Sequence, residues 1–343
     1  MPKDTMKRLI NQEENRAFVE QVDKLGVSHV TEVLQDTKYP WVERKKKTLR
    51  LADIYKLAGY VREVEMAKSC ARQLEYLAMK DGRRTLQRAI FCKLRLCPMC
   101  GARRAAKAAL QLSKALTWVE EQHPGVQYLF LTLTVKNCKP NELGDTLTLL
   151  LTAFSKLRRH RPVARAIKGW YRAVEITRSK GLYHPHIHMI IAVEPDYFER
   201  SKGLYLTQKA WEAHWQSALG VTYKPRVDIR AAHKRGEKKA ELAAAQEAAK
   251  YATKDSDYLA PNIPEAEAVE VVKTYTEALR GRRLIAVGGW MKDAMQALNL
   301  NPEDDDLVHI NDDAIREDVA ELVEVYRWSF GLSDYRLLYR EEK

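Results

Sequence analysis

Two histidines at alternate positions of an apolar segment have a spacing that could support chemistry. The segment His184-Pro185-His186-Ile187-His188-Met189 has the alternation of a β-strand, in which every second side chain lies on one face. His186 and His188 would then point the same way, and Glu175 on the preceding strand could supply an oxygen ligand across a hairpin. This donor set suits Mg²⁺ or Mn²⁺ acting on phosphate, although Zn²⁺ would also be accepted. Taken alone, the histidine pair is equally typical of a surface strand or a hydrogen-bonded core pair.

A second group of chemically capable residues follows in a segment expected to be a helix over residues 237–254. Glu247, Tyr251 and Lys254 are spaced four and three residues apart, so they share one helix face. A tyrosine hydroxyl, with a pKa of about 10, attacks a phosphate only when a metal activates it. Lys254 could add positive charge, and Glu247 could be the base for a second transfer. Without a metal nearby, the same pattern is typical of an ordinary half-buried aromatic residue.

Four of the five cysteines are candidates for a structural metal site. Cys92, Cys97 and Cys100 have the spacing C-x4-C-x2-C, and Cys70 lies 22 positions before Cys92. Four thiolates would form a tetrahedral structural Zn²⁺ site, and reduced buried cysteines are the alternative; whether Cys70 is the fourth ligand stays open. A basic helix is expected over residues 102–118, directly after the cysteine-containing turn at Cys97 and Cys100. Its candidate DNA contacts are Arg103, Arg104 and Lys107.

Three segments in fixed order resemble the three motifs of rolling-circle Rep proteins in the HUH endonuclease superfamily. They are Phe130-Leu131-Thr132-Leu133-Thr134, His184-Pro185-His186-Ile187-His188 and Lys250-Tyr251-Ala252-Thr253-Lys254. The motif spacing and the sequence Val-Glu-Ile-Thr around Glu175 resemble the bacterial small-plasmid Rep family that uses one tyrosine. The resemblance covers roughly residues 65–290 and extends to the cysteine-rich segment that ends in Cys-Pro-x-Cys.

The resemblance implies a role for each matching residue. His186 and His188 match the metal-binding pair, and Lys254 matches the lysine of the third motif. Tyr251 matches the nucleophile that cuts the double-strand origin, leaving a 5′-phosphotyrosine and a free 3′-hydroxyl. Glu247 matches the glutamate that helps a water end the round. Tyr258, seven residues beyond Tyr251, is too far along to act as a second nucleophile, which favours a single-tyrosine enzyme.

The predicted function is therefore metal-dependent, origin-specific nicking and joining of plasmid DNA in rolling-circle replication. The expected partners are origin DNA that is single-stranded at the nick, and a host helicase with the replication machinery. The expected setting is the bacterial cytoplasm, with no membrane partner. The alternatives are a single-tyrosine transposase or relaxase, a non-catalytic zinc-dependent DNA-binding regulator and, less well supported, a histidine-dependent metallohydrolase, which would leave Tyr251 and Lys254 without a role.

The elements expected to position these residues form an α+β fold, with a central antiparallel sheet covered by helices and a zinc-bearing, mostly helical N-terminal region. Residues 127–135, 169–177, 186–193 and 227–229 are predicted strands, with a turn at 179–181. Residues 141–159 and 207–219 are predicted helices, and the first ends in the basic run Arg158-Arg159-His160-Arg161. A second basic run, Arg44-Lys45-Lys46-Lys47, is interpreted as a solvated turn or a phosphate contact.

The charge distribution separates the C-terminal segment from the rest of the chain. The net charge is +12, yet residues 301–343 hold 13 acidic and 5 basic side chains, so the first 300 residues carry +20. This asymmetry suits a body that binds a polyanion. We expect a zinc-containing DNA-binding region over 1–120, a nickase domain over 121–290 and an acidic helical segment over 291–343. With no run of about 18 apolar residues and no signal peptide, the protein is expected to be soluble and intracellular.

Overall fold

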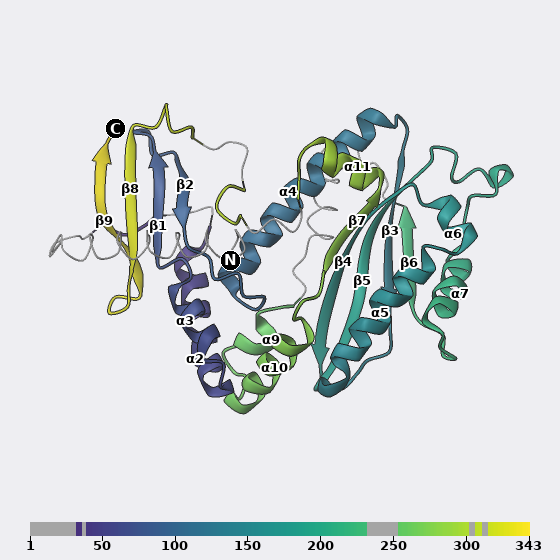
Figure 1. The fold of residues 1–343 in the computed structure, drawn as a ribbon, viewed down its shortest axis with the longest axis horizontal. Coiled ribbons are helices and arrows are strands. Elements are labelled where there is room, and N and C mark those ends of the chain that lie inside the picture. Colours follow the sequence, from purple (N-terminus) through teal and green to yellow (C-terminus); the bar gives the residue numbers. More distant parts are fainter. Residues whose placement is uncertain (1–31, 36–38, 232–252, 302–305, 311–314) are drawn as a thin grey trace, which may run out of the picture. The chain divides into compact units, whose positions relative to one another are not determined.

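The computed structural model describes residues 32–35, 39–231, 253–301, 306–310 and 315–343. The chain divides into two compact units (Figure 1). We call Pro40–Arg72 with Arg88–Ala314 the central unit, and Met1–Tyr39 with Gln73–Gln87 and Ile315–Lys343 the terminal unit. The predicted boundaries at 120 and 290 do not coincide with this division, because residues 73–87 group with the C-terminal segment.

The central unit is built around a five-stranded sheet in the order β6-β3-β5-β4-β7. All its neighbouring strands are antiparallel, as the sequence predicted. The predicted strands correspond to β3, β4 and β6 with ends that differ by one or two residues, and to β5, which begins four residues earlier than predicted. Strand β7 was not predicted. The bounds are β3 Gln127–Thr134, β4 Gly169–Ser179, β5 Leu182–Val193, β6 Val227–Ala231 and β7 Ile285–Gly289.

The turn between β4 and β5 fixes which side chains face one another. Lys180 and Gly181 both have positive φ, 50° and 75°, as the tightest hairpin turns require. The resulting register places Glu175 opposite His186. On the other side of β5, Thr132 of β3 lies opposite His188. Residues opposite one another in a sheet project from the same face, so the two histidines, Glu175 and Thr132 share a face.

Helices cover both faces of this sheet (Figure 1). On the face that carries the histidines, α4 (Pro98–Gln122) and α11 (Trp290–Ala297) pack onto a buried cluster that includes Leu116, Tyr171 and Met291. On the opposite face lie α5 (Leu143–Leu157), α6 (Arg161–Ala166) and α7 (Gln208–Leu219). The predicted helices over 102–118, 141–159 and 207–219 are confirmed as α4, α5 and α7.

The remaining helices of the central unit surround the cysteines and follow the third predicted motif. Among the described residues, we find no helix with the length and apolar character that a membrane crossing requires. The bounds are α2 Trp41–Ala58, α3 Val61–Ser69, α9 Ser256–Leu259 and α10 Glu265–Ala278, with short 3₁₀ turns η1 Pro140–Glu142 and η2 Arg200–Lys202.

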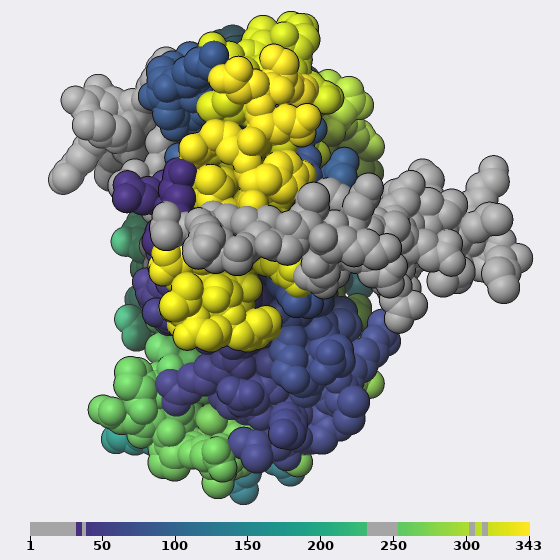
Figure 2. Space-filling view, turned by 90° about the vertical axis from the view of Figure 1, so that its left-hand side faces the viewer, coloured from purple at the N-terminus to yellow at the C-terminus, as the bar shows by residue number. Residues whose placement is uncertain are grey.

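The terminal unit contains a four-stranded sheet in the order β2-β1-β8-β9. Its strands are β1 Gln73–Ala78, β2 Arg84–Ala89, β8 Leu322–Ser329 and β9 Asp334–Glu342, and the last two form much of the surface in yellow in Figure 2. The prediction of an acidic C-terminal helix was therefore wrong. The buried carboxylate of β8 is paired across the sheet, since Glu324 lies 2.6 Å from the Arg340 guanidinium of β9.

Candidate active site

Glu175, His186 and His188 form a compact group, which we call the trio. Glu175 Oε2 lies 2.9 Å from His188 Nε2 and 3.5 Å from His186 Nε2, and the two Nε2 atoms are 3.0 Å apart. Glu175 and His186 are buried, whereas the His188 side chain is 23% exposed. The three donor atoms therefore converge at a point with access to solvent, as the hairpin register predicted.

Hydrogen bonds at the far side of each ring fix its orientation. His186 Nδ1 lies 3.0 Å from the backbone oxygen of His184. His188 Nδ1 lies 3.2 Å from the Thr132 hydroxyl of the neighbouring strand. A carbonyl oxygen accepts only, so His186 carries a proton on Nδ1. Its Nε2 faces the trio, where it can donate to Glu175 when protonated or bind a metal ion when unprotonated. Thr132, which belongs to the first of the three motifs quoted above, holds the second ring.

The electrostatics of the trio favour an ionised carboxylate. Hydrogen bonds from His186 and then His188 hold the pKa of Glu175 far below its usual value, although burial opposes them. Lys254 adds positive charge, with its Nζ 3.9 Å from Glu175 Oε1. The Lys254 side chain is 59% exposed, so this long ion pair contributes little to stability. The contact does place Lys254, the lysine of the third motif, beside the trio.

The distances within the trio fit a divalent cation. Neighbouring ligands of an octahedral ion bound at about 2.1 Å lie about 3.0 Å apart, close to the separations in the trio. Two neutral imidazoles and one carboxylate leave three such positions for water or phosphate oxygens. The trio can therefore hold a hard divalent cation with open coordination positions.

The four cysteines meet in a second buried group in the central unit. Cys70 Sγ lies 3.7 Å from Cys97 Sγ and 3.6 Å from Cys100 Sγ, and Cys92 Sγ lies 3.6 Å from Cys100 Sγ. These separations are too long for disulfides. They approach the roughly 3.8 Å between sulfurs bound tetrahedrally to Zn²⁺ at about 2.3 Å. Cys70, whose membership the sequence left open, lies among the other three.

Thiol ionisation in this group is set by burial and by neighbouring thiols. Burial raises the pKa of Cys70 and of Cys92. It acts on Cys97 too, where hydrogen bonds from the other thiols outweigh it and lower the pKa. A structural Zn²⁺ would bind the thiolate forms.

Lys45 lies beside the four cysteines, a position that the sequence did not predict. The basic run to which it belongs predicted a solvated or phosphate-binding lysine, but its side chain is fully buried in α2. Its Nζ donates to the backbone oxygens of Lys68 and Cys70. Burial lowers the pKa of Lys45 to about 8, although the nearby thiols counteract this effect. Lys45 therefore positions the backbone that carries Cys70.

The basic residues of α4 do not form the exposed DNA-binding surface that their sequence suggested. Arg103 and Lys107 are buried. Arg103 donates to the backbone oxygens of Leu307 and Val308, and Lys107 to that of Asp306. Arg104 donates to the backbone oxygens of Lys93 and Leu94. Their donors satisfy carbonyl groups of the segments packed against α4, which sequence spacing could not reveal.

The structure also bears on the tyrosines. Tyr251 and Glu247 lie outside the described residues, so their positions relative to the trio stay predictions. Tyr258 is buried, and its hydroxyl donates to the Leu96 backbone oxygen at 2.6 Å. The Tyr258 hydroxyl is thus engaged with the backbone of the central unit, and the single-tyrosine site stays a prediction.

The fold and the trio together define a protein with a histidine–carboxylate site on an antiparallel sheet. The chain matches the family described as "Replication protein" over residues 83–336, and it belongs to that family. The predicted membership of the Rep family is thereby confirmed.

Individual relatives agree with this placement. The chain is 33% identical over 299 residues to "Protein rep" of Lentilactobacillus hilgardii, covering 86% of this chain and 94% of that protein. It is 37% identical over 278 residues to "Protein rep" of Streptococcus pneumoniae, covering 80% of this chain and 84% of that protein. A "Replication protein" of Staphylococcus aureus is 32% identical over 228 residues, covering 65% of this chain and 96% of that protein. No solved structure matches the chain significantly.

Proposed function

We propose that this protein initiates rolling-circle replication of a plasmid by nicking one strand of the origin and later rejoining it. The observation that carries the proposal is the convergence of Glu175, His186 and His188, with Lys254 beside them, in a chain of the replication protein family. A regulator that only binds DNA has no need of a solvent-accessible trio of this composition.

In this proposal, the trio binds Mg²⁺ or Mn²⁺, which would neutralise the non-bridging oxygens of the scissile phosphate. Thr132 and the His184 backbone hold the two imidazoles so that their Nε2 lone pairs face the ion. The ionised Glu175 would balance part of the charge of the metal ion. Lys254 lies close enough to Glu175 to act on the same phosphate group.

The proposed nucleophile is Tyr251, three residues before Lys254 in the sequence. Its hydroxyl oxygen attacks the phosphorus and gives up its proton, and the bond between the phosphorus and the 3′-oxygen breaks. The products are a 5′-phosphotyrosine and a free 3′-hydroxyl that can prime synthesis. Glu247 acts as the base that activates a water, or a 3′-hydroxyl, to attack the phosphotyrosine when the round ends.

The cysteine cluster is proposed to hold a structural Zn²⁺ through Cys70, Cys92, Cys97 and Cys100. The cluster connects the start of α4 to the end of α3, and buried Lys45 donates to the intervening backbone. A tetrathiolate zinc site carries a net negative charge, which a buried ammonium group partly offsets.

The test of the proposed chemistry is trapping of the covalent adduct. The protein is incubated with a labelled single-stranded oligonucleotide library and Mn²⁺, and the adducts are resolved and sequenced. Tyr251→Phe should abolish nicking and adduct while DNA binding is retained. Tyr258→Phe, which removes a buried hydroxyl from the same region, is the matched control and should still form the adduct. Normal adduct in Tyr251→Phe would refute the assignment.

The role of Glu247 has its own test. Glu247→Ala should nick normally but release fewer closed circles, because the second transfer lacks its base. Unaffected termination would mean that Glu247 has no part in the reaction.

The proposed partner is plasmid origin DNA, single-stranded where it is cut, and the proposed setting is the cytoplasm of a bacterium, since the relatives come from bacteria. A host helicase would then unwind the template from the nick. Membership of the replication protein family favours this function over a transposase or a relaxase.

A further inference from the structure

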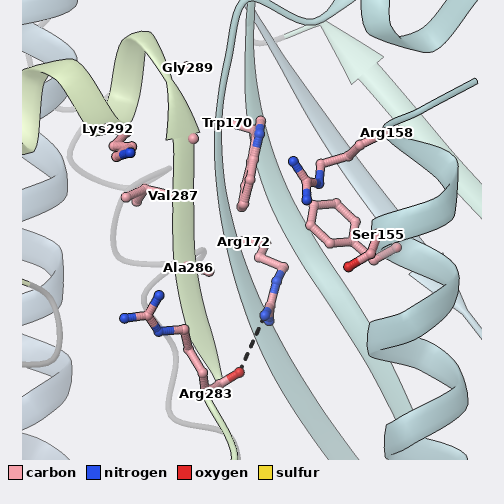
Figure 3. A pocket seen from close by; sticks show the side chains of 11 residues that line it. Ser155, Arg158, Trp170, Arg172, Arg283, Ala286, Val287, Gly289 and Lys292 are labelled. Carbon is pink, nitrogen blue, oxygen red and sulfur yellow. Dashed lines mark hydrogen bonds between the residues drawn. The ribbon is translucent and has the colours of Figure 1, made fainter. Parts of the chain in front are cut away.

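A basic hollow of about 470 Å³ lies in the central unit, lined by residues of α5, β4, β7 and α11. Figure 3 shows the basic side chains Arg158, Arg172, Arg283 and Lys292 around it. None of its described lining residues is acidic. Such a concentration of positive charge, with no acidic residue in the described lining, favours an anionic ligand.

This hollow is separate from the trio. Side chains alternate between the two faces of a strand, so Trp170 and Arg172 of β4 project from the face opposite that of Glu175. Arg158, Trp170 and Arg172 therefore line the hollow from the α5 side of the sheet, whereas Lys292 lines it from α11, beyond the edge strand β7. Arg172 and Glu175 are three residues apart, roughly 10 Å along β4.

Aromatic rings hold the Arg158 guanidinium in place. Its central carbon lies 4.9 Å from the ring centroid of Trp170 and 5.3 Å from that of Phe154. Trp170 lies between β7 and Arg158 (Figure 3), and a Cβ atom at Gly288 would overlap its ring. With Gly288 against one side and Arg158 near the other, Trp170 supports the cation and offers little free ring surface to a nucleic-acid base.

Hydrogen bonds to backbone oxygens orient a second arginine, Arg172. Arg172 donates to the backbone oxygens of Leu284 and Arg283, at 3.3 and 3.4 Å, and its guanidinium lies 5.4 Å from the Phe154 ring centroid. Two guanidinium groups thus share one aromatic support. Preorganised guanidinium groups are well suited to phosphate, because their N–H donors match its oxygens.

The charge of Arg158 is not balanced by another part of the described chain. No described carboxylate forms an ion pair with its guanidinium, and its Nε is buried without a hydrogen-bond partner. Lys292 is exposed and likewise has no ion pair among the described residues. An unpaired guanidinium in a partly buried position is costly unless an external anion satisfies it.

We propose that this hollow binds a backbone phosphate of DNA, without regard to base sequence, on the side of the sheet away from the cut. The identification of the polyanion as DNA rests on the proposed function, whereas the preference for phosphate rests on the basic side chains. A DNA molecule that contacts both faces is held on two sides of the sheet. The hollow then contributes affinity and position, and the trio supplies the chemistry.

The test is DNA binding by charge-removing variants in the full-length protein, without added Mg²⁺ or Mn²⁺. The probes are a fluorescent mixed-sequence single strand and a duplex of the same sequence, each measured by anisotropy from 0.1 to 0.4 M KCl. Arg158→Gln and Lys292→Gln are compared with Arg161→Gln, which removes an exposed charge of the same basic run outside the hollow. Thermal melting checks that each variant folds, and exposed Lys292 is the safer of the two sites.

Loss of one phosphate contact should weaken binding about five- to eightfold at 0.1 M salt and reduce the salt slope by about one charge. We expect this for Arg158→Gln and Lys292→Gln with at least one of the two probes, and less than a twofold change for Arg161→Gln with both. The probe with the larger loss identifies the single strand or the duplex as the source of the phosphate.

Two results would overturn the proposal. Equal losses in all three variants would indicate a diffuse electrostatic effect. Unchanged DNA affinity in folded Arg158→Gln and Lys292→Gln, together with variant-dependent binding of dATP or inorganic phosphate, would assign the hollow to a free nucleotide. Adduct formation is measured separately through Tyr251→Phe, so failure of the nicking proposal and failure of this one are distinguishable.

Discussion

Thr132→Val tests whether the bond between Thr132 and His188 prepares the trio for a metal ion. Valine preserves the shape of threonine on β3 but removes the hydroxyl that lies 3.2 Å from His188 Nδ1. Partners that orient metal-binding histidines typically contribute 10- to 100-fold to metal affinity, or about 1.4–2.8 kcal/mol. His188 is the most exposed member of the trio, so packing restrains its ring least, and Thr132 is its only described partner at Nδ1. We therefore expect Mn²⁺ affinity to fall about tenfold or more.

Thr134→Val is the matched control for this substitution. Thr134 lies two residues along the same face of β3 and opposite His186, yet its hydroxyl donates to the Arg226 backbone oxygen instead of a histidine ring. It should lose stability without a comparable loss of Mn²⁺ affinity. Isothermal titration with Mn²⁺ measures the metal affinity of the two variants, and thermal melting measures their stability. Nicking by Thr132→Val should recover at saturating Mn²⁺. Equal Mn²⁺ affinities in the two variants would refute the role of Thr132.

Three further predictions concern the rest of the central unit. Cys97→Ser should release Zn²⁺ and lower the melting temperature of the whole protein, as should a strong chelator; a zinc content unchanged from wild type would contradict the assigned ligand set. The pKa of Glu175 is lower in the folded protein than its ordinary 4.5, so its stabilisation is complete above that value and is lost as the pH falls. In metal-free protein, Glu175→Gln should therefore flatten the acid limb of a stability–pH curve, and an identical curve would show that the hydrogen bonds to the histidines contribute nothing. Gly288→Ala should destabilise the protein by roughly 1–3 kcal/mol, because its Cβ would overlap the Trp170 ring; denaturation at wild-type stability would mean that Trp170 moves freely.

The parts of the fold that sequence predicted best are those with strong local patterns. The alternation around Thr132 and His188 and the tight turn at Gly181 were enough to predict the strands β3, β4 and β5 and the hairpin that joins β4 to β5, whereas the pairing of β3 with β5 comes from the structure. The same patterns brought Glu175 to His186 and His188. Residues within one hairpin are linked by a short stretch of chain, so local sequence determines their pairing.

What the sequence could not show depends on contacts between distant residues. The C-terminal strands were mistaken for a helix because their charge pattern says nothing about Glu324 pairing with Arg340 or about β8 pairing with β1. Arg103 was assigned to DNA because the carbonyl groups that bind it belong to residues some 200 positions later. Strand propensity and charge are weak guides where tertiary partners decide the outcome.

The sheet of the terminal unit has a consequence for synthesis of the protein on the ribosome. Strand β1 pairs with β2 on one side and with β8 on the other, and about 240 residues separate β2 from the end of β8. At about 5–20 residues per second, the first two strands emerge roughly 10–50 s before the third. During that interval the edge of β1 that β8 will cover is available to chaperones or to another nascent chain. Completion of this sheet therefore reports that translation has reached the last residues, and a chain that ends early lacks it.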